Sequence, residues 1–149
     1  MTIGIDISQL AYPNTGVSNY LKNLVEHLIK IDNNNKYVFF FSSFRRDLPK
    51  LSIKNNTEIK KFKLPPVLLD LLWNKLHIFP IEKFIGDVDV FITSDWTEPP
   101  ALRAKKGTIL YDLIVYKFPH ETDSKIIQTQ KRKLRWVKKE SSMVFCISE

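Results

Sequence analysis

The sequence predicts an α/β domain in which a mostly parallel sheet carries helices on both faces. Two observations predict this class. Short runs rich in Ile, Val and Phe alternate along the chain with segments whose apolar residues recur at helical spacing, and the first run starts almost at the N-terminus. The length also fits, because a chain of 149 residues corresponds to one domain and buries enough surface for a core without metal or disulfide support.

The first half of the chain predicts three strands and one long helix. Residues 3–7 form a short apolar run, and the Pro-Asn-Thr-Gly sequence at 13–16 predicts a loop. Residues 17–30 place apolar side chains along one broad stripe, which predicts a helix that packs on the sheet. Residues 37–42 are a continuous apolar run typical of a strand covered on both faces, and the loosely alternating residues 57–64 predict a third strand.

The second half continues the alternation. Two adjacent prolines fit the first turn of a helix over residues 67–77. Residues 87–93, 107–113 and 143–147 are apolar runs that predict strands, and residues 124–139 predict a long helix. This order of elements predicts a Rossmann-like, doubly wound sheet in a single domain over residues 1–149.

Ligands of such sheets bind beyond the carboxyl ends of the strands. We therefore expect functional residues in the three loops over 8–16, 94–100 and 111–120. In the first loop, Asn14, Thr15 and Gly16 precede a helix whose free N–H groups and dipole favour an anion such as a phosphate. A plain turn is the alternative, since the chain lacks both the GxGxxG and the GxxxxGK[ST] pattern.

The two later loops contain carboxylates beside aromatic side chains. Asp95, Trp96 and Glu98 follow a predicted strand, where two carboxylates and an aromatic ring can hydrogen-bond and stack on a sugar. A polar loop shaped by two prolines is the alternative. Tyr111 and Asp112 follow the next strand, where Asp112 either orients a substrate hydroxyl or caps a loop.

Several other classes of site find no support in the sequence. The three histidines lie where solvated side chains are expected, without a carboxylate, Ser or Cys partner at an interpretable spacing. No catalytic triad and no metal-ligand pattern can be argued, and the single cysteine cannot form an internal disulfide. The chain has neither a signal-peptide pattern nor an apolar run of the ~18 residues that a membrane span needs. We expect a cytoplasmic protein without a metal or other cofactor.

The charge indicates an anionic partner. The net charge is +7, and the segment 125–139 carries seven cations and no acid. There Lys131, Arg132, Arg135 and Trp136 suit an anionic membrane surface, on whose inner face the protein would be peripheral. Stacking on nucleic acid and a simple solvated face are the alternatives. The very apolar segment 67–79 is expected to pack in the core, with contact to lipid or an apolar acceptor as the second interpretation.

Several motifs together resemble a known family. Their order and spacing are similar to those of the N-terminal domain of group 1 (family 4) glycosyltransferases, from residue 3 to the last residue. The motifs are Ile-Gly-Ile-Asp at 3–6, Asn-Thr-Gly-Val-Ser-Asn-Tyr-Leu at 14–21, Val-Asp-Val-Phe at 88–91 followed by Pro99-Pro100, Tyr-Asp-Leu at 111–113 followed by Phe118-Pro119, and Phe-Cys-Ile-Ser-Glu at 145–149.

The resemblance implies the GT-B architecture, in which two Rossmann-like domains face each other across a cleft. It implies retaining transfer of a sugar from a nucleoside-diphosphate sugar to a sugar, lipid-linked or protein acceptor, without a bound metal. The N-terminal domain would mainly hold the acceptor, lined by the loop of Asp95 and Trp96. The turn ending at Gly16 would approach the donor phosphates.

Two departures from the family are visible. Many relatives carry His-Asp where this chain has Tyr111-Asp112, and that His contacts the donor sugar; Tyr111 can replace it by hydrogen bonding but supplies no imidazole. The family's C-terminal, nucleotide-binding domain lies outside these 149 residues, and Ser148-Glu149 is similar to the cap of a helix leading toward it.

One wall of a two-domain cleft can position an acceptor but cannot stabilise a leaving diphosphate. We therefore expect the 149-residue chain alone to be inactive, as a piece of a longer enzyme or one half of a split one. A basic membrane-surface adaptor and a nucleic-acid-binding module are the alternatives. Binding to RNA or DNA that falls steeply with salt would indicate the latter.

Overall fold

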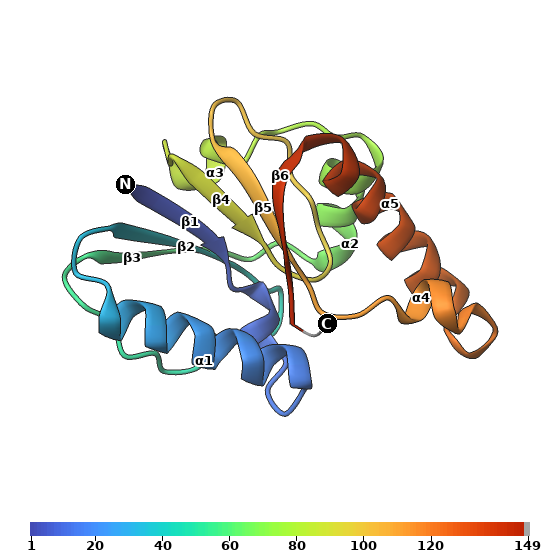
Figure 1. Ribbon diagram of the computed structural model, residues 1–149, viewed down its shortest axis with the longest axis horizontal. Helices are drawn as coiled ribbons and strands as arrows, with labels where there is room; N and C mark the ends of the chain where they lie inside the picture. Colours follow the sequence, from blue (N-terminus) through green and yellow to red (C-terminus); the bar gives the residue numbers. More distant parts are fainter. Residues whose placement is uncertain (148–149) are drawn as a thin grey trace.

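The computed structural model describes residues 1–147, which form a six-stranded sheet whose strands are all parallel (Figure 1). The strand order is β3-β2-β1-β4-β5-β6. The predicted Rossmann-like, doubly wound α/β fold is therefore confirmed. The strands are β1 (Thr2–Asp6), β2 (Lys36–Ser42), β3 (Thr57–Phe62), β4 (Val90–Thr93), β5 (Lys105–Leu110) and β6 (Ser141–Cys146).

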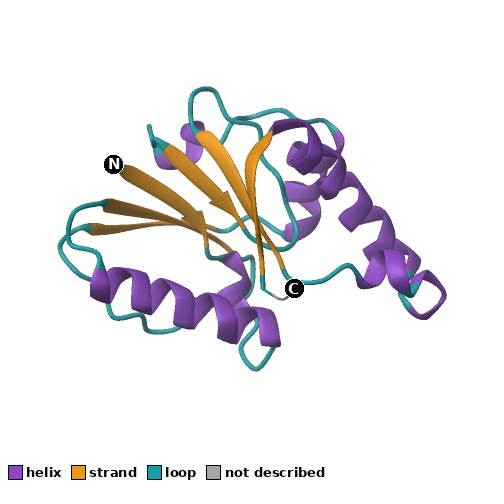
Figure 2. Ribbon diagram, viewed as in Figure 1, coloured by secondary structure: helices purple, strands orange, loops and turns teal. Residues whose placement is uncertain are grey.

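Helices cover both faces of the sheet (Figure 2). On one face lies α1 (Gly16–Ile31), and on the other lie α2 (Pro66–Leu69), the π-helical turn η2 (Asp70–Lys75), α3 (Glu82–Ile85) and α5 (Ser124–Glu140). The change of face follows from right-handed crossovers, because the chain reverses its direction across the sheet after β3. Three short turns lie in the loops after β1 and β5, namely η1 (Ser8–Ala11), α4 (Ile114–Lys117) and η3 (Pro119–Glu121).

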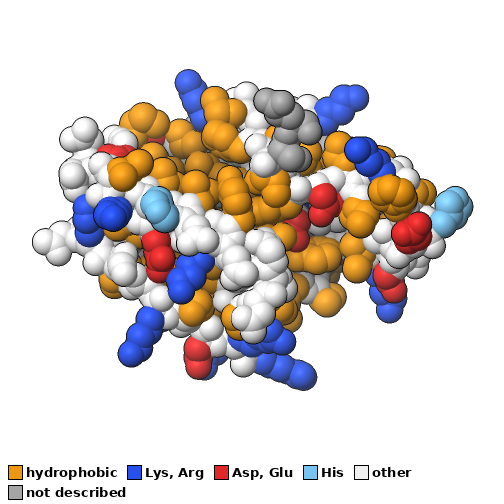
Figure 3. Space-filling view, turned by 60° about the horizontal axis from the view of Figure 1, so that its bottom comes forward, with side chains coloured by type: hydrophobic (Ala, Val, Ile, Leu, Met, Phe, Trp, Pro, Cys, Tyr) orange, Lys and Arg blue, Asp and Glu red, His pale blue; other side chains and the backbone are white. Residues whose placement is uncertain are grey.

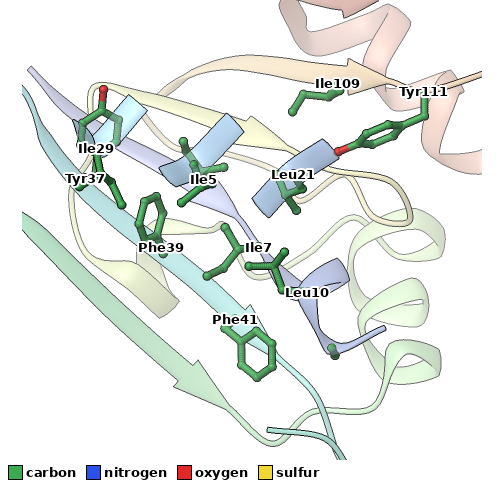
Figure 4. Close-up of a cluster of buried hydrophobic side chains, with 12 residues drawn as sticks. Ile5, Ile7, Leu10, Leu21, Ile29, Tyr37, Phe39, Phe41, Ile109 and Tyr111 are labelled. Atoms are coloured by element: carbon green, nitrogen blue, oxygen red, sulfur yellow. The ribbon is translucent and has the colours of Figure 1, made fainter. Parts of the chain in front are cut away.

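The core consists of one hydrophobic cluster on each face of the sheet. The strand β2 contributes to both, since side chains alternate along a strand. Tyr37, Phe39 and Phe41 pack toward α1 (Figure 4), whereas Val38 and Phe40 pack toward α2, η2 and α3. This two-sided burial explains the unbroken apolar run in the sequence.

The described elements differ from the predicted ones mainly at their ends. The expected helix over 67–77 consists of α2 followed by the wider turn η2, within which Trp73 packs against Phe40. The strand β5 covers Lys105–Leu110 and not 107–113, because Asp112 Oδ1 accepts a hydrogen bond from the Ile114 amide (3.0 Å) and starts α4. The expected helix cap at 148–149 lies outside the described residues.

Within residues 1–147, no helix has both the length and the apolar character needed to cross a bilayer.

Candidate functional site

The loops after β1, β4 and β5 come together at the carboxyl edge of the sheet, where the strand order reverses. The strand β1 pairs with β2 on one side and with β4 on the other, so that the chain leaves β1 and β4 toward opposite faces. Such a switch point leaves a crevice beyond the strand ends. Two cavities open there, and Asp95 and Trp96 line both of them.

The larger cavity, which we call the switch-point cavity, has a volume of about 510 Å³. It combines a polar set of side chains with an apolar set. The polar set is Asp6, Ser8, Gln9, Thr15, Ser42, Asp95 and Thr97. The apolar and aromatic set is Tyr12, Val17, Pro66, Leu69 and Trp96.

Two buried polar residues line this cavity, one at the end of β1 and one in the turn η1. Asp6 is 5% exposed, and its Oδ1 accepts a hydrogen bond from the Ser8 amide (2.9 Å). Burial raises the pKa of Asp6, and the hydrogen bond from Ser8 opposes the rise. Gln9 is 8% exposed, and its side-chain amide makes no hydrogen bond to any residue that the structure describes. Both side chains therefore retain capacity to bind a ligand.

Asp95 lies between the two cavities. The Gln130 side-chain amide donates to the Asp95 carboxylate (3.3 Å) and to its backbone carbonyl (3.2 Å), which ties the loop after β4 to α5. Burial raises the pKa of Asp95, while the nearby charge of Lys133 lowers it. A carboxyl in this position keeps its proton to higher pH than an exposed aspartate does.

Lys133 is a buried cation beneath the loop after β4. It is 1% exposed, and its Nζ donates a hydrogen bond to the Ser94 carbonyl. Burial lowers the pKa of Lys133, whereas the neighbouring Glu98, Asp95 and Asp6 raise it. The alternative interpretation of these cations as a simple solvated face is therefore wrong for Lys133.

The smaller cavity has a volume of about 330 Å³ and contains the predicted pair Tyr111 and Asp112. The Tyr111 hydroxyl lies 3.3 Å from Ser94 Oγ, and its ring meets that of Tyr20 edge-on, with the ring centres 5.7 Å apart. Burial raises the pKa of Tyr111, so that the phenol stays protonated. Asp112 is exposed, and its Oδ1 accepts a hydrogen bond from the Ile114 amide at the start of α4.

The sequence predicts Glu98 as a sugar-binding carboxylate, but Glu98 lies outside both cavities. It is fully buried, and its Oε1 lies 2.9 Å from Lys106 Nζ. Its Oε2 accepts a hydrogen bond from Thr93 Oγ1 (2.6 Å), and Ser141 Oγ donates to its Oε1 (3.1 Å). Glu98 therefore fixes the base of the loop that presents Asp95.

Asn74 of the turn η2 holds the same loop from the other side. It is fully buried; its Nδ2 donates to the Trp96 carbonyl (2.9 Å), and its Oδ1 accepts from the Glu98 amide (3.0 Å). The Trp136 indole N–H in turn donates to the Asn74 carbonyl (2.8 Å). The position of Trp96 thus depends on contacts between η2 and α5.

The first loop supplies the start of α1. Thr15 Oγ1 accepts a hydrogen bond from the Ser18 amide (3.2 Å), which is an N-cap. Asn14 and Gly16 are exposed at the rim, and Asn14 has a φ of 70°, which suits the tight turn. A Cβ at Gly16 would meet no atom within 4 Å, so packing does not require glycine there.

The basic helix α5 is less free than its sequence predicts. The Trp136 ring stacks on His77, with ring centres 3.5 Å apart, and Arg132 Nη2 pairs with Asp70 Oδ2 at 2.8 Å. His77 is hydrogen-bonded to Glu140 (2.8 Å), so the expectation that it is solvated and lacks a carboxylate partner is wrong.

The other two predicted anion-binding residues remain at the surface. Lys131 is exposed, with its Nζ 5.8 Å from the ring centre of Tyr116. Arg135 is also exposed, and its guanidinium lies 5.0 Å from the ring centre of Trp136. These two cations can therefore meet an external anion without breaking an ion pair.

The fold and the site together define a Rossmann-like α/β domain with paired cavities at its switch point. Within residues 1–147, no three His, Cys, Asp or Glu side chains gather so that they could hold a metal ion. No family model, curated protein or solved structure matches the chain. The sequence pattern missed Asp6, Gln9, Lys133 and Asn74. The available signal was the position of Asp6 and Gln9 at the end of the first strand.

Proposed function

We propose that this chain is the acceptor-side, Rossmann-like N-terminal domain of a retaining glycosyltransferase of group 1 (family 4). It would take part in the transfer of a sugar from a nucleoside-diphosphate sugar to an acceptor. The observation that carries this proposal is the pair of cavities that share Asp95 and Trp96 at the switch point. Three motifs of the resemblance, Asn-Thr-Gly at 14–16, Pro99-Pro100 and Tyr-Asp-Leu at 111–113, lie in the loops around them.

Each part of the edge has a role in this proposal. The acceptor occupies the switch-point cavity, where carboxyl and amide groups hold its hydroxyls. The donor phosphates approach the exposed N-terminus of α1 at Thr15 and Gly16, where free backbone N–H groups favour an anion. Tyr111 and Asp112 then lie on the side where the donor sugar meets the acceptor.

The proposal requires a second lobe that binds the nucleotide, either as further residues of the same protein or as a separate polypeptide. A groove beside Asp112 supports this requirement. Leu113, Ile114, Phe118 and Ile147 line it, and each is about half exposed. Figure 3 shows hydrophobic side chains across this face of the molecule. An apolar surface of this kind is typical of a contact with another protein surface.

A transfer assay tests the proposal. The protein isolated from its native source, together with any polypeptide bound to it, is incubated with radiolabelled UDP-, GDP- and ADP-sugars and with extracts that contain native acceptors. We expect transfer of label with retention of the anomeric configuration, and none from the isolated 149-residue chain. Asp95→Asn should lower the rate, and the exposed Asp87→Asn should leave it unchanged.

Two outcomes would contradict the proposal. If the native complex neither binds a nucleoside-diphosphate sugar nor transfers label, the chain is not part of a glycosyltransferase. If the isolated chain transfers sugar by itself, one lobe is sufficient and the two-lobe mechanism is wrong.

Contact with a membrane surface is a second proposal, and the turn α4 favours it. Tyr116, which lies outside the groove assigned to the second lobe, is about half exposed there, and the exposed Lys117 and Lys131 lie beside it. Such a surface suits anionic headgroups and would bring a cytoplasmic enzyme to a lipid-linked acceptor. Sedimentation with vesicles tests it: binding should need anionic lipid and should fall for Tyr116→Ser.

A further inference from the structure

A third cavity lies next to the switch-point cavity and differs from it in charge. It has a volume of about 320 Å³ and is lined by α2, η2 and the first half of α5, so we call it the α2–α5 cavity. Trp96 and Thr97 line both cavities. The described residues that line the switch-point cavity include two carboxyl groups and no Lys, Arg or His, whereas three cations line the α2–α5 cavity. An anion is therefore favoured in the α2–α5 cavity and disfavoured in its neighbour.

The three cations come from two elements that pack against each other. Lys125 and Arg132 lie seven residues apart on α5, which places them on the same face of the helix, and Lys75 comes from η2. Among the described residues, a single carboxylate lines the cavity with them. Asp70 Oδ2 lies 2.8 Å from Arg132 Nη2 and 4.0 Å from Lys75 Nζ. Since Asp70 neutralises one of the three cations, the cavity keeps an excess of two positive charges.

The guanidinium of Arg132 lacks an acceptor. Its Nη2 donates to Asp70 Oδ2 (2.8 Å) and to Thr129 Oγ1 (3.0 Å), but its Nε is buried without a hydrogen-bond partner. Within residues 1–147, Glu82 Oε2 is the other buried side-chain atom in this condition. Buried donors are normally paired with protein, water or an ion, and a guanidinium binds oxyanions through neighbouring N–H groups. A small turn of the guanidinium toward an oxyanion in the cavity would supply the missing acceptor.

The start of α5 adds to the positive field. Its first turn contains Lys125 and no acidic residue, and the acid nearby is the N-cap Asp123, whose Oδ1 accepts a hydrogen bond from the Lys125 amide (2.7 Å). The positive end of a helix dipole disfavours a cation in the first turn. An anion in the cavity would offset the charge of Lys125 as well as that of Arg132.

The size of the charge and the remaining wall define the ligand. A phosphate monoester carries about −1.5 to −2 charges at pH 7, which matches the excess of two cations better than the single charge of a carboxylate. The Thr129 hydroxyl, which accepts from Arg132, keeps its own proton to donate. Val67, which is 80% exposed, and Trp96 add apolar surface beside the cations. This combination fits a phosphate attached to an organic group.

We propose that the α2–α5 cavity is a binding site for a phosphate monoester, which Arg132 binds directly and which Lys75 and Lys125 attract from the rim. The organic group of the ligand lies against Val67 and Trp96. A soluble phosphate ester and a phosphatidic acid headgroup offer the same chemistry. The site goes beyond the proposed function, because anion binding here requires neither a sugar donor nor a second lobe.

An NMR titration of the ¹⁵N-labelled full chain tests the site with soluble probes. The probes are inorganic phosphate, glycerol 3-phosphate and, as a monoanion, acetate. We expect the two phosphates to shift the amide signals of Lys125, Thr129 and Arg132, and acetate to bind at least about ten-fold more weakly. Phosphate shifts confined to Thr15 and Gly16 would place the anion at the start of α1 and would overturn the inference. Equal affinity for acetate and phosphate would overturn it as well.

Two matched pairs of variants locate the binding. Arg132→Gln should weaken phosphate at least about ten-fold, since it removes a charge-assisted hydrogen bond, whereas Arg103→Gln changes an exposed arginine outside the cavity and should have no effect. Lys125→Gln should weaken phosphate about two- to five-fold, and the exposed Lys138→Gln on the same helix should not. Circular dichroism checks folding, and the lysine pair keeps the test decisive if Arg132→Gln does not fold. Equal effects within each pair would overturn the inference.

Vesicle sedimentation separates the two sources of the phosphate. Phosphatidylcholine vesicles contain either phosphatidic acid, a monoester, or phosphatidylglycerol, a diester, at matched surface potential. A preference for phosphatidic acid that Arg132→Gln removes would assign the site to a lipid headgroup. Binding of glycerol 3-phosphate without that preference would assign it to a soluble ester. If the chain neither binds glycerol 3-phosphate nor prefers phosphatidic acid, the inference is wrong.

Discussion

Replacing Lys106 by methionine should destabilise the protein strongly, because it removes the cation that is in direct contact with the buried Glu98. Lys106 Nζ lies 2.9 Å from Glu98 Oε1 and 3.0 Å from Glu140 Oε2. The Glu98 side chain is 0% exposed, whereas that of Glu140 is 28% exposed and can gain water. Methionine keeps the apolar volume of the lysine stem, so the variant mainly removes the charge.

The magnitude follows from the burial of Glu98. Breaking a buried ion pair from one side costs about 3–5 kcal/mol, and the exposed Glu140 adds little. Thr93 and Ser141 still donate to the Glu98 carboxylate, but neither hydroxyl carries a charge. For a domain of this size, the loss corresponds to a fall in Tm of roughly 6–20 °C.

Urea unfolding followed by circular dichroism measures this loss. Lys105→Met is the matched control, since Lys105 is the exposed neighbour on the same strand. It should change the free energy of unfolding by less than about 0.5 kcal/mol. Adding Glu98→Gln to Lys106→Met should recover most of the loss, because the buried charge of Glu98 that lost its contacting cation is then removed as well.

Equal effects of the Lys105 and Lys106 substitutions would refute the claim that this ion pair holds the loop. The claim would also be refuted if the double variant of Lys106→Met and Glu98→Gln were less stable than Lys106→Met alone by the amount expected for a second, independent substitution.

Four other substitutions test separate parts of the structure. Gly4→Ala should cost about 1–3 kcal/mol in urea unfolding, since a Cβ there would lie 2.7 Å from Phe91 Cδ2; Gly16→Ala, where a Cβ meets nothing, should cost nothing but should slow sugar transfer by the native complex. Asp6→Asn should become more stabilising as the pH rises from 4 to 7. The raised pKa of Asp6 makes the folded state hold a proton that the unfolded chain releases above about pH 3.9. A difference in unfolding free energy between the variant and the unsubstituted chain that stays constant with pH would contradict this. Trp96→Ala should lower the rate of sugar transfer by the native complex, with unchanged circular dichroism.

Much of the fold could be predicted because its signals are local. The unbroken apolar run of β2 and the stripe of α1 each depend on side chains within one element, and both elements appear where the sequence predicts them. The carboxyl edge follows from strand order, which right-handed crossovers restrict. The three loops could therefore be selected before any contact was known.

The details of the site could not be predicted in the same way, because they depend on residues far apart in the chain. Lys133 reads as a surface cation of a basic helix, but its partner Ser94 comes from the loop after β4. Trp136 falls among cations by helical angle, yet His77 stacks on it. No local pattern encodes such pairings.

Glu98 and Asp95 illustrate the same limit within one loop. They lie three residues apart and have similar sequence surroundings. Glu98 is buried in an ion pair with Lys106, whereas Asp95 lines the cavity and accepts a hydrogen bond from Gln130. Only the packing of β5 and α5 separates the structural carboxylate from the candidate functional one.

The most direct measurement is sugar transfer by the native complex, with the isolated chain and the Asp95→Asn variant assayed beside it. If this chain forms only the acceptor wall of the cleft, we expect retention of configuration in the product and no activity of the 149-residue chain alone. The rate should also fall in the variant. Transfer by the isolated chain would mean that one lobe is sufficient for catalysis, and full activity of Asp95→Asn would mean that the switch-point edge is not where the acceptor binds.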